Sequence, residues 1–292
     1  MHVFVTGASG FIGSAVVAEL LAAGHEVTGL ARSAESAAAI RAAGAVPHRG
    51  DLADPAGLRT AAETADAVAH LAFHHDFTDY ARAGELDRQA ITAFGEALAG
   101  SNRPLLVTSG LAALGTGDLI TESDAATPGM PRQSEAAALG YVERGVRVVA
   151  IRLSPTVHDK GDHGFVPRLI EIARETGVAA YPGEGANRWP AVHRLDAARL
   201  FRLALEQPVG APAGSILHGV AEEGITSRVI AEAIGTGLGL PVRQAEPEHF
   251  GWLGAFFAID MAASSDHTRK ALGWNPIEVG LLDDLAQGHY FG

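Results

Sequence analysis

The sequence predicts an α/β fold, a doubly wound parallel sheet with a smaller C-terminal lid. Three observations support this fold class. In the first half of the 292 residues, β-rich runs alternate with helical runs, a rhythm typical of parallel strands joined by covering helices. A glycine-rich turn follows the first β-rich run at once. After Leu153 the alternation stops, and Pro, Gly, His and Trp become frequent.

The expected elements follow one another in chain order. The first strand ends at Thr6, and a helix over residues 14–23 stops at Gly24. Further strands are expected over 26–30, 45–48, 67–72, 104–108 and 146–153, with helices over 33–43, 54–64, 79–99 and 131–144 between them. Asp54 and Pro55 supply an N-cap and a proline at the first helical position. A helix over 196–206 and a strand over 215–220 are expected to return to the main sheet.

These expectations divide the chain into two domains. Residues 1–153, together with about 191–220, are expected to form the large domain. The segments at about 154–190 and 221–292 are expected to form the small one.

Composition excludes several classes of protein. A hydrophobic content of 47% supports a full core, and the absence of cysteine excludes disulfides, thiolate metal sites and a cysteine nucleophile. The net charge of −12 argues against nucleic acid as a partner. No apolar run reaches the roughly 18 residues that a membrane span needs. The first strand begins at the N-terminus and leaves no room for a signal peptide, so we expect a cytoplasmic protein.

The turn after the first strand contains glycine at positions 7, 10 and 13. A strand that feeds such a turn into a helix presents backbone N–H groups and the positive end of the helix dipole to a phosphate. Gly7 allows the chain to turn, Gly10 allows close approach to a pyrophosphate, and Gly13 allows the helix to pack on the strand. The turn therefore predicts a dinucleotide site.

The chain resembles the extended and atypical short-chain dehydrogenase/reductase superfamily, of the NAD-dependent epimerase/dehydratase-like type. The matching segments are residues 6–13, 50–52, 70–72, 108–110, 152–155, 189–193 with Asp196, 268–269 and 272–276. The resemblance covers nearly the whole chain. It implies a Rossmann-type NAD(P)-binding domain and a small substrate-binding domain.

The family's Tyr-x-x-x-Lys motif is missing. Of the four tyrosines, Tyr80, Tyr141 and Tyr181 are each followed four residues later by glycine, and the two lysines lie elsewhere. Alignment puts Pro131 at the tyrosine position and Glu135 at the lysine position. The family's serine position falls on Gly110, one residue after Ser109. The chain therefore resembles an atypical subgroup that lacks the usual catalytic residues.

The resemblance implies a set of residues that bind the cofactor. They are Thr6, Gly7, Ser9, Gly10, Phe11, Ile12, Gly13, Asp51, Leu52, Leu71, Ala72, Thr108, Pro155 and Val157. The second strand ends without an acidic residue, and Arg32 and Ser33 follow it. An arginine there grips a 2′-phosphate, which favours NADP(H) over NAD(H). The alternative for Arg32 is a solvent-exposed side chain that starts a helix.

Three polar segments follow strands at the edge where ligands bind in such sheets. His74, His75 and Asp76 follow the fourth strand, with His75 a candidate general acid; the alternative is a helix-capping Asp76 with surface histidines. His158 follows the sixth strand and is a second candidate. The alternative is that this segment is only a mobile loop. Trp189 and His193 offer a flat wall and a donor, unless His193 only hydrogen-bonds the sheet. These are candidate substrate contacts.

We expect an NADP(H)-dependent oxidoreductase that reduces a carbonyl or imine of a small organic substrate. Ser109 would orient the acceptor oxygen and His75 would supply the proton. The alternatives are an NADP(H)-sensing protein without catalysis and an epimerase or dehydratase. The 13 histidines match no helical two-histidine ligand pattern, so no metal is expected. A homodimer through the helices at 79–99 and 131–144 would follow family habit.

Overall fold

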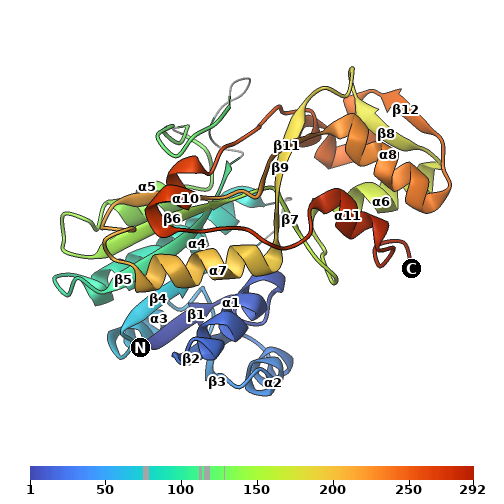
Figure 1. Cartoon of the computed structure of the whole chain (residues 1–292). Coiled ribbons are helices and arrows are strands. Elements are labelled where there is room, and N and C mark those ends of the chain that lie inside the picture. Colours follow the sequence, from blue (N-terminus) through green and yellow to red (C-terminus); the bar gives the residue numbers. More distant parts are fainter. Residues whose placement is uncertain (75–78, 112–113, 115–118, 128) are drawn as a thin grey trace.

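The structure is a computed structural model that describes residues 1–74, 79–111, 114, 119–127 and 129–292. Its centre is a seven-stranded sheet in the order β10-β6-β5-β4-β1-β2-β3, with every pairing parallel (Figure 1). Its strands are β1 (His2–Thr6), β2 (Glu26–Ala31), β3 (Val46–Arg49), β4 (Ala67–His70), β5 (Pro104–Gly110), β6 (Arg147–Leu153) and β10 (Ser215–Gly219). The predicted doubly wound α/β fold is confirmed.

Helices cover both faces of this sheet. They are α1 (Phe11–Ala22), α2 (Ala34–Ala42), α3 (Pro55–Glu63), α4 (Tyr80–Leu98), α5 (Ser134–Leu139) and α7 (Arg194–Glu206). Successive side chains of a strand point to opposite faces, so Val3 and Val5 join a core cluster with α1 and α7. Phe4, between them, joins the cluster of Leu58 on α3 and Phe94 on α4. The buried strands are therefore apolar on both sides.

Local signals place most helix ends as expected. The Asp54 carboxylate accepts a hydrogen bond from the Gly57 N–H at 3.1 Å and caps α3, with Pro55 at the first helical position. Asp79 caps α4 by accepting from the Arg82 N–H at 3.2 Å. These caps satisfy N–H groups that would otherwise have no partner at the start of each helix.

The helix expected over 131–144 is a correction. Only Ser134–Leu139 is α-helical, and Gly140 is its C-cap. Beyond it, backbone hydrogen bonds join residues three apart instead of four; the Tyr141 N–H, for example, donates to the Ala138 carbonyl at 2.9 Å. Gly145 then adopts a φ of +74°, which reverses the chain into β6. The glycines end the helix earlier than its alanine content indicates.

The chain after β6 builds a second group of elements, seen beyond the main sheet in Figure 1. The strands are β7 (Thr156–His158), β9 (Arg188–His193) and β11 (Glu222–Thr226) in one sheet, and β8 (Ala179–Pro182) with β12 (Val242–Ala245) in another. The helices are α6 (Phe165–Thr176), α8 (Ser227–Leu238), α9 (Gly254–Phe257) and α11 (Leu281–Ala286), with the 3₁₀ helix Pro247–Leu253. Their core contains Trp189, Phe250 and Phe257.

A few residues of each expected domain pack in the hydrophobic core of the other. Leu111 and Ile120, which come after β5, pack in the second core. Leu272 at the end of α10 (Asp266–Leu272) and Trp274 pack in the core of the main sheet. The domain limits themselves stay a prediction. Within the described part of the chain, no helix has both the length and the apolar character needed to cross a bilayer.

Candidate active site at the carboxyl ends of the strands

At positions 7 and 13, the turn between β1 and α1 has room only for glycine. Gly7 has a φ of +70°, and a Cβ there would lie 2.8 Å from the Ala72 nitrogen. A Cβ on Gly13 would lie 2.0 Å from the Gly7 carbonyl oxygen. Gly10 is the N-cap of α1, and the first turn of that helix has no acidic residue. The positive end of α1 is therefore open to an anion, and the turn fits the pyrophosphate of a dinucleotide.

Thr6 ties this turn to the end of β4. Its hydroxyl oxygen accepts the N–H groups of Leu71 at 3.2 Å and Ala72 at 3.1 Å, and lies 2.7 Å from Nδ1 of His70. Because the oxygen already accepts two bonds, its own hydrogen goes to Nδ1. The proton of His70 is therefore on Nε2, which donates to Asp87 at 3.1 Å.

A chain of hydrogen bonds continues from Asp87 on α4 to the end of β5. Ser134 donates to Asp87 Oδ2 at 2.7 Å, and Arg132 Nε donates to the Ser134 hydroxyl at 2.9 Å. Arg132 also donates to the Thr108 carbonyl at 2.7 Å. Burial raises the pKa of Asp87, but the hydrogen bond and charge of His70, the charge of Arg132 and the hydrogen bond from Ser134 together outweigh it, so the pKa lies below the ordinary value. Asp87 is therefore an anion at neutral pH.

Arg132 thus lies at the carboxyl end of β5, bonded to the carbonyl of Thr108, the residue before the half-buried Ser109. Its guanidinium carbon is 4.1 Å from the ring centroid of Phe73, which follows β4. Tyr80, at the start of α4, is 5.6 Å from Phe73 between ring centroids. Burial raises the pKa of Tyr80, partly opposed by the charge of Arg132, so the phenol stays protonated at neutral pH.

Glu135, at the position aligned with the family lysine, has a different partner. Its two carboxylate oxygens accept from Nε and NH2 of Arg152, both at 2.7 Å. Arg152 has no exposed surface and Glu135 is 6% exposed. This bidentate pair joins α5 to β6 and leaves neither side chain for a ligand.

At the other end of the turn lie the residues expected to read the adenosine half of the cofactor. Arg32 is exposed and forms no hydrogen bond or ion pair with another described residue. The Ser33 hydroxyl caps α2 by accepting from the Ser36 N–H at 3.0 Å. Asp51, which follows β3, accepts from the Ala53 N–H at 2.9 Å and precedes the buried Leu52. Since β2 pairs with β3, these residues lie along one edge of the sheet.

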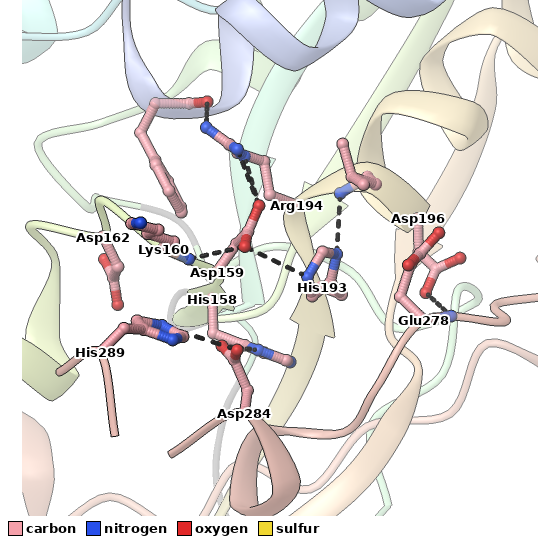
Figure 2. Close-up of polar contacts among 12 residues, drawn as sticks. His158, Asp159, Lys160, Asp162, His193, Arg194, Asp196, Glu278, Asp284 and His289 are labelled. Atoms are coloured by element: carbon pink, nitrogen blue, oxygen red, sulfur yellow. Dashed lines mark hydrogen bonds and ion pairs between the residues drawn. The ribbon is translucent and has the colours of Figure 1, made fainter. Parts of the chain in front are cut away.

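The histidines after β6 form part of a buried polar cluster (Figure 2). His158 has no exposed surface and bonds Asp284 on α11 through Nδ1 at 2.9 Å. Burial lowers the pKa of His158, although the Asp284 carboxylate opposes this, so the ring is neutral with its proton on Nδ1. His193 accepts the Leu195 N–H at 3.2 Å and caps α7. Both imidazoles hold secondary elements together.

Arg194 connects this cluster to the start of α1, next to the turn that is expected to bind the pyrophosphate. It donates to Asp159 at 2.7 Å (Figure 2). Its guanidinium carbon lies 4.8 Å from the ring centroid of Phe11. Trp189 is 1% exposed within the second core. The roles of His158, Trp189 and His193 as substrate contacts stay predictions.

The remaining expected residues are placed as follows. His75 and Asp76 lie outside the described residues, and His74 is half-buried beside them. Pro155 and Val157 are half-buried just past β6. Arg132 and Asp87 were not among the expected residues, although Arg132 directly follows the position aligned with the family tyrosine. That neighbourhood was the one signal in the sequence that pointed to it.

Residues 3–89 match the model of the NAD-dependent epimerase/dehydratase family. "Uncharacterized protein C2A9.02" of Schizosaccharomyces pombe is 50% identical over 298 residues, covering 100% of both chains. A 2-alkyl-3-oxoalkanoate reductase of Stenotrophomonas maltophilia is 27% identical over 219 residues, 70% of this chain and 66% of that one. The dTDP-glucose 4,6-dehydratase DesIV of Streptomyces venezuelae, solved with NAD bound, superposes with a TM-score of 0.80 at 23% identity over 99% of this chain and 96% of that one. The chain therefore belongs to one family with the Schizosaccharomyces pombe protein. Its residues 3–89 match the NAD-dependent epimerase/dehydratase family model, and it shares the fold of DesIV over nearly its whole length.

Proposed function

We propose that the protein is an NADP(H)-dependent oxidoreductase that reduces a carbonyl or imine of a small organic substrate. The observation that carries the cofactor assignment is the glycine turn, in which a Cβ at Gly13 would lie 2.0 Å from the Gly7 carbonyl oxygen. This close packing keeps the open N-terminus of α1 against the end of β1, where N–H groups meet a pyrophosphate.

The preference for NADP(H) rests on the end of β2. A carboxylate at this place binds the ribose hydroxyls of NAD and repels a 2′-phosphate. Here Arg32 supplies a positive charge instead, and its side chain is exposed and unengaged by the other described residues. Ser33 already caps α2, so Arg32 carries most of the preference.

A bound nicotinamide would supply the hydride for the carbonyl carbon, and the carbonyl oxygen would take up one proton to give the alcohol. Ser109, at the end of β5, orients that oxygen. His75 remains the proton donor expected from the sequence. Tyr80 is a second candidate, because its phenol is protonated at neutral pH and lies close to Arg132. Comparing His75→Ala with Tyr80→Phe assigns the donor: the variant that loses turnover but still binds NADPH identifies it.

Two other functions have support of their own. The missing Tyr-x-x-x-Lys motif favours a protein that senses NADP(H) without turnover. The family description favours an epimerase or dehydratase. We favour reduction because the Stenotrophomonas relative, by its name, is a reductase of oxo acids, and because Arg132 donates to the carbonyl of Thr108, the residue before Ser109 on β5.

Calorimetric titration with NADPH, NADP, NADH and NAD tests the cofactor, and NADPH oxidation with a panel of carbonyls and imines tests the reaction. We expect tight binding of NADPH, weak binding of NADH, and oxidation that depends on substrate. Binding without turnover on any substrate would support the sensor. An absence of binding by all four nucleotides would overturn the proposed function.

A further inference from the structure

Arg132 is a half-buried cation at the catalytic end of the sheet with no carboxylate partner among the described residues. A guanidinium has five N–H donors in a planar fork. Here Nε is bonded to Ser134 and NH2 to the Thr108 carbonyl, which accounts for two donors. The NH1 group and the second hydrogen of NH2 donate to no described residue.

Among the described residues, the two buried arginines Arg147 and Arg152 have more hydrogen-bond partners. Arg152 forms a bidentate pair with Glu135. Arg147 has no carboxylate, but it donates to three main-chain carbonyls at 2.6–3.0 Å, those of Ala204, Leu205 and Ala211. Arg132 has one carbonyl and one hydroxyl. Arg132 therefore has fewer protein partners than these two arginines.

The residues around Arg132 hold its guanidinium in place without neutralising its charge. The Phe73 ring covers one face at 4.1 Å, and Ser134 and Thr108 hold one edge. Among the described residues, Asp87 acts on Arg132 through the Ser134 hydroxyl, and its two oxygens accept from His70 and Ser134. Asp87 thus offsets part of the cost of burying the cation and leaves the outer donors for a ligand. A planar fork held in this way suits a carboxylate.

We propose that Arg132 binds a carboxylate of the substrate, so that the substrate is an oxo acid. Arg132 bonds the carbonyl of Thr108, and Ser109 is the next residue on β5. A substrate with its carbonyl at Ser109 and its carboxylate at Arg132 therefore carries the two groups within a few bonds of each other, as 2-oxo and 3-oxo acids do. This inference rests on the proposed function, because it concerns the substrate of the same site.

The test compares an acid with its ester in the wild-type protein, Arg132→Met and Arg132→Lys. The probes are 3-oxohexanoate and methyl 3-oxohexanoate, with NADPH oxidation as the readout. We expect Arg132→Met to lower kcat/KM for the acid by about 10- to 150-fold, the range that a charge-assisted hydrogen bond supports, and for the ester by less than about 3-fold. Arg132→Lys keeps the charge but loses the fork, so its loss on the acid is intermediate.

Two controls separate folding and cofactor effects from recognition of the carboxylate. NADPH affinity, measured by calorimetry, stays the same in all three proteins. Arg59→Met removes an exposed cation that pairs only with Glu63 among the described residues, and it leaves both substrates unaffected. Equal losses on acid and ester in Arg132→Met would mean that Arg132 only supports the fold, and would overturn the proposal.

A binding measurement keeps the proposal testable if turnover is absent. The product analogue 3-hydroxyhexanoate is titrated into the NADP complex of the wild type and of Arg132→Met. We expect binding that is lost in the variant. A wild-type complex that does not bind the acid overturns the oxo acid assignment. NADPH oxidation with neutral carbonyls but not with acids would overturn it too, while the proposed function would stand.

Discussion

His70 donates a hydrogen bond from Nε2 to Asp87 Oδ1 at 3.1 Å, and each side chain is only 1% exposed. The pair joins the end of β4 to α4. Through Thr6 it reaches the phosphate turn, and through Ser134 it reaches Arg132. One buried carboxylate therefore connects the predicted cofactor turn with the predicted substrate end.

Asp87→Asn should lower the free energy of unfolding at pH 7 by about 1–3 kcal/mol, because buried hydrogen bonds to a charged group are lost. The pKa of Asp87 is below its ordinary 3.8 in the folded state. Its stabilising contribution is therefore complete above pH 3.8 and is lost as the pH falls through the folded-state pKa. Urea denaturation at pH 7 and at pH 3 measures the difference. A difference as large at pH 3 as at pH 7 would contradict the charged state of Asp87.

The Arg152–Glu135 pair should be costly to break and less costly to replace. Glu135→Ala leaves a buried cation without a partner and should lower the free energy of unfolding by about 3–5 kcal/mol. The double variant Glu135→Leu with Arg152→Met removes both charges and should recover most of that loss. Chemical denaturation of the two proteins measures both effects. A double variant no more stable than the single one would contradict this account.

Gly13→Ala should abolish nucleotide binding, because its Cβ would lie 2.0 Å from the Gly7 carbonyl oxygen and main-chain atoms cannot yield. The matched control is Gly140→Ala, where the nearest atom to a Cβ is 3.7 Å away and the backbone is right-handed helical. Calorimetry with NADPH and thermal unfolding report on both proteins. Wild-type affinity in Gly13→Ala would contradict a dinucleotide site at the turn between β1 and α1.

Arg32→Ala should weaken NADPH binding by about 10- to 100-fold, in keeping with loss of one charge-assisted contact to phosphate, and leave NADH binding unchanged. Titration of both nucleotides into the variant and the wild type gives the two ratios. A fall of equal size for NADH would show that Arg32 does not read the 2′-phosphate.

Asp162→Asn should stabilise the protein near neutral pH. Burial raises the pKa of Asp162 to about 6, and the side chain bonds the Gly164 N–H at 2.7 Å and the Tyr290 hydroxyl at 3.2 Å. A carboxyl with a raised folded-state pKa contributes stability that is full below pH 3.8 and is lost as the pH rises to about 6. Allowing for partial solvent screening, the gain at pH 7.5 should be about 1–2 kcal/mol, and it should vanish at pH 4. A gain that persists at pH 4 would point to another cause.

The features that the sequence predicts well are those set by neighbouring residues. The turn at Gly7, Gly10 and Gly13 is fixed by main-chain contacts within a few residues, and the α3 cap by Asp54 and Pro55. The predicted length of the helix that ends at Leu139 was wrong. The effect of Gly140 and Gly145 outweighs the helix propensity of the alanines around them.

The polar networks depend on distant parts of the chain. Ser134 bonds Asp87 across 47 residues, and no spacing rule pairs them. The sequence does not predict a role for Arg132, because an isolated arginine gives no periodic or spacing signal. Its position became apparent only when β5, α4 and the segment before α5 were folded against one another.

The bond between His158 and Asp284 spans 126 residues. At 5–20 residues per second, a ribosome needs roughly 6 to 25 s to add them. During that interval the nascent chain can complete the first strands of the main sheet, but the imidazole of His158 has no carboxylate to meet it. The polar cluster around His158 therefore closes only after residue 284 has been made, and the second core of a shorter nascent chain lacks the side chains of α11.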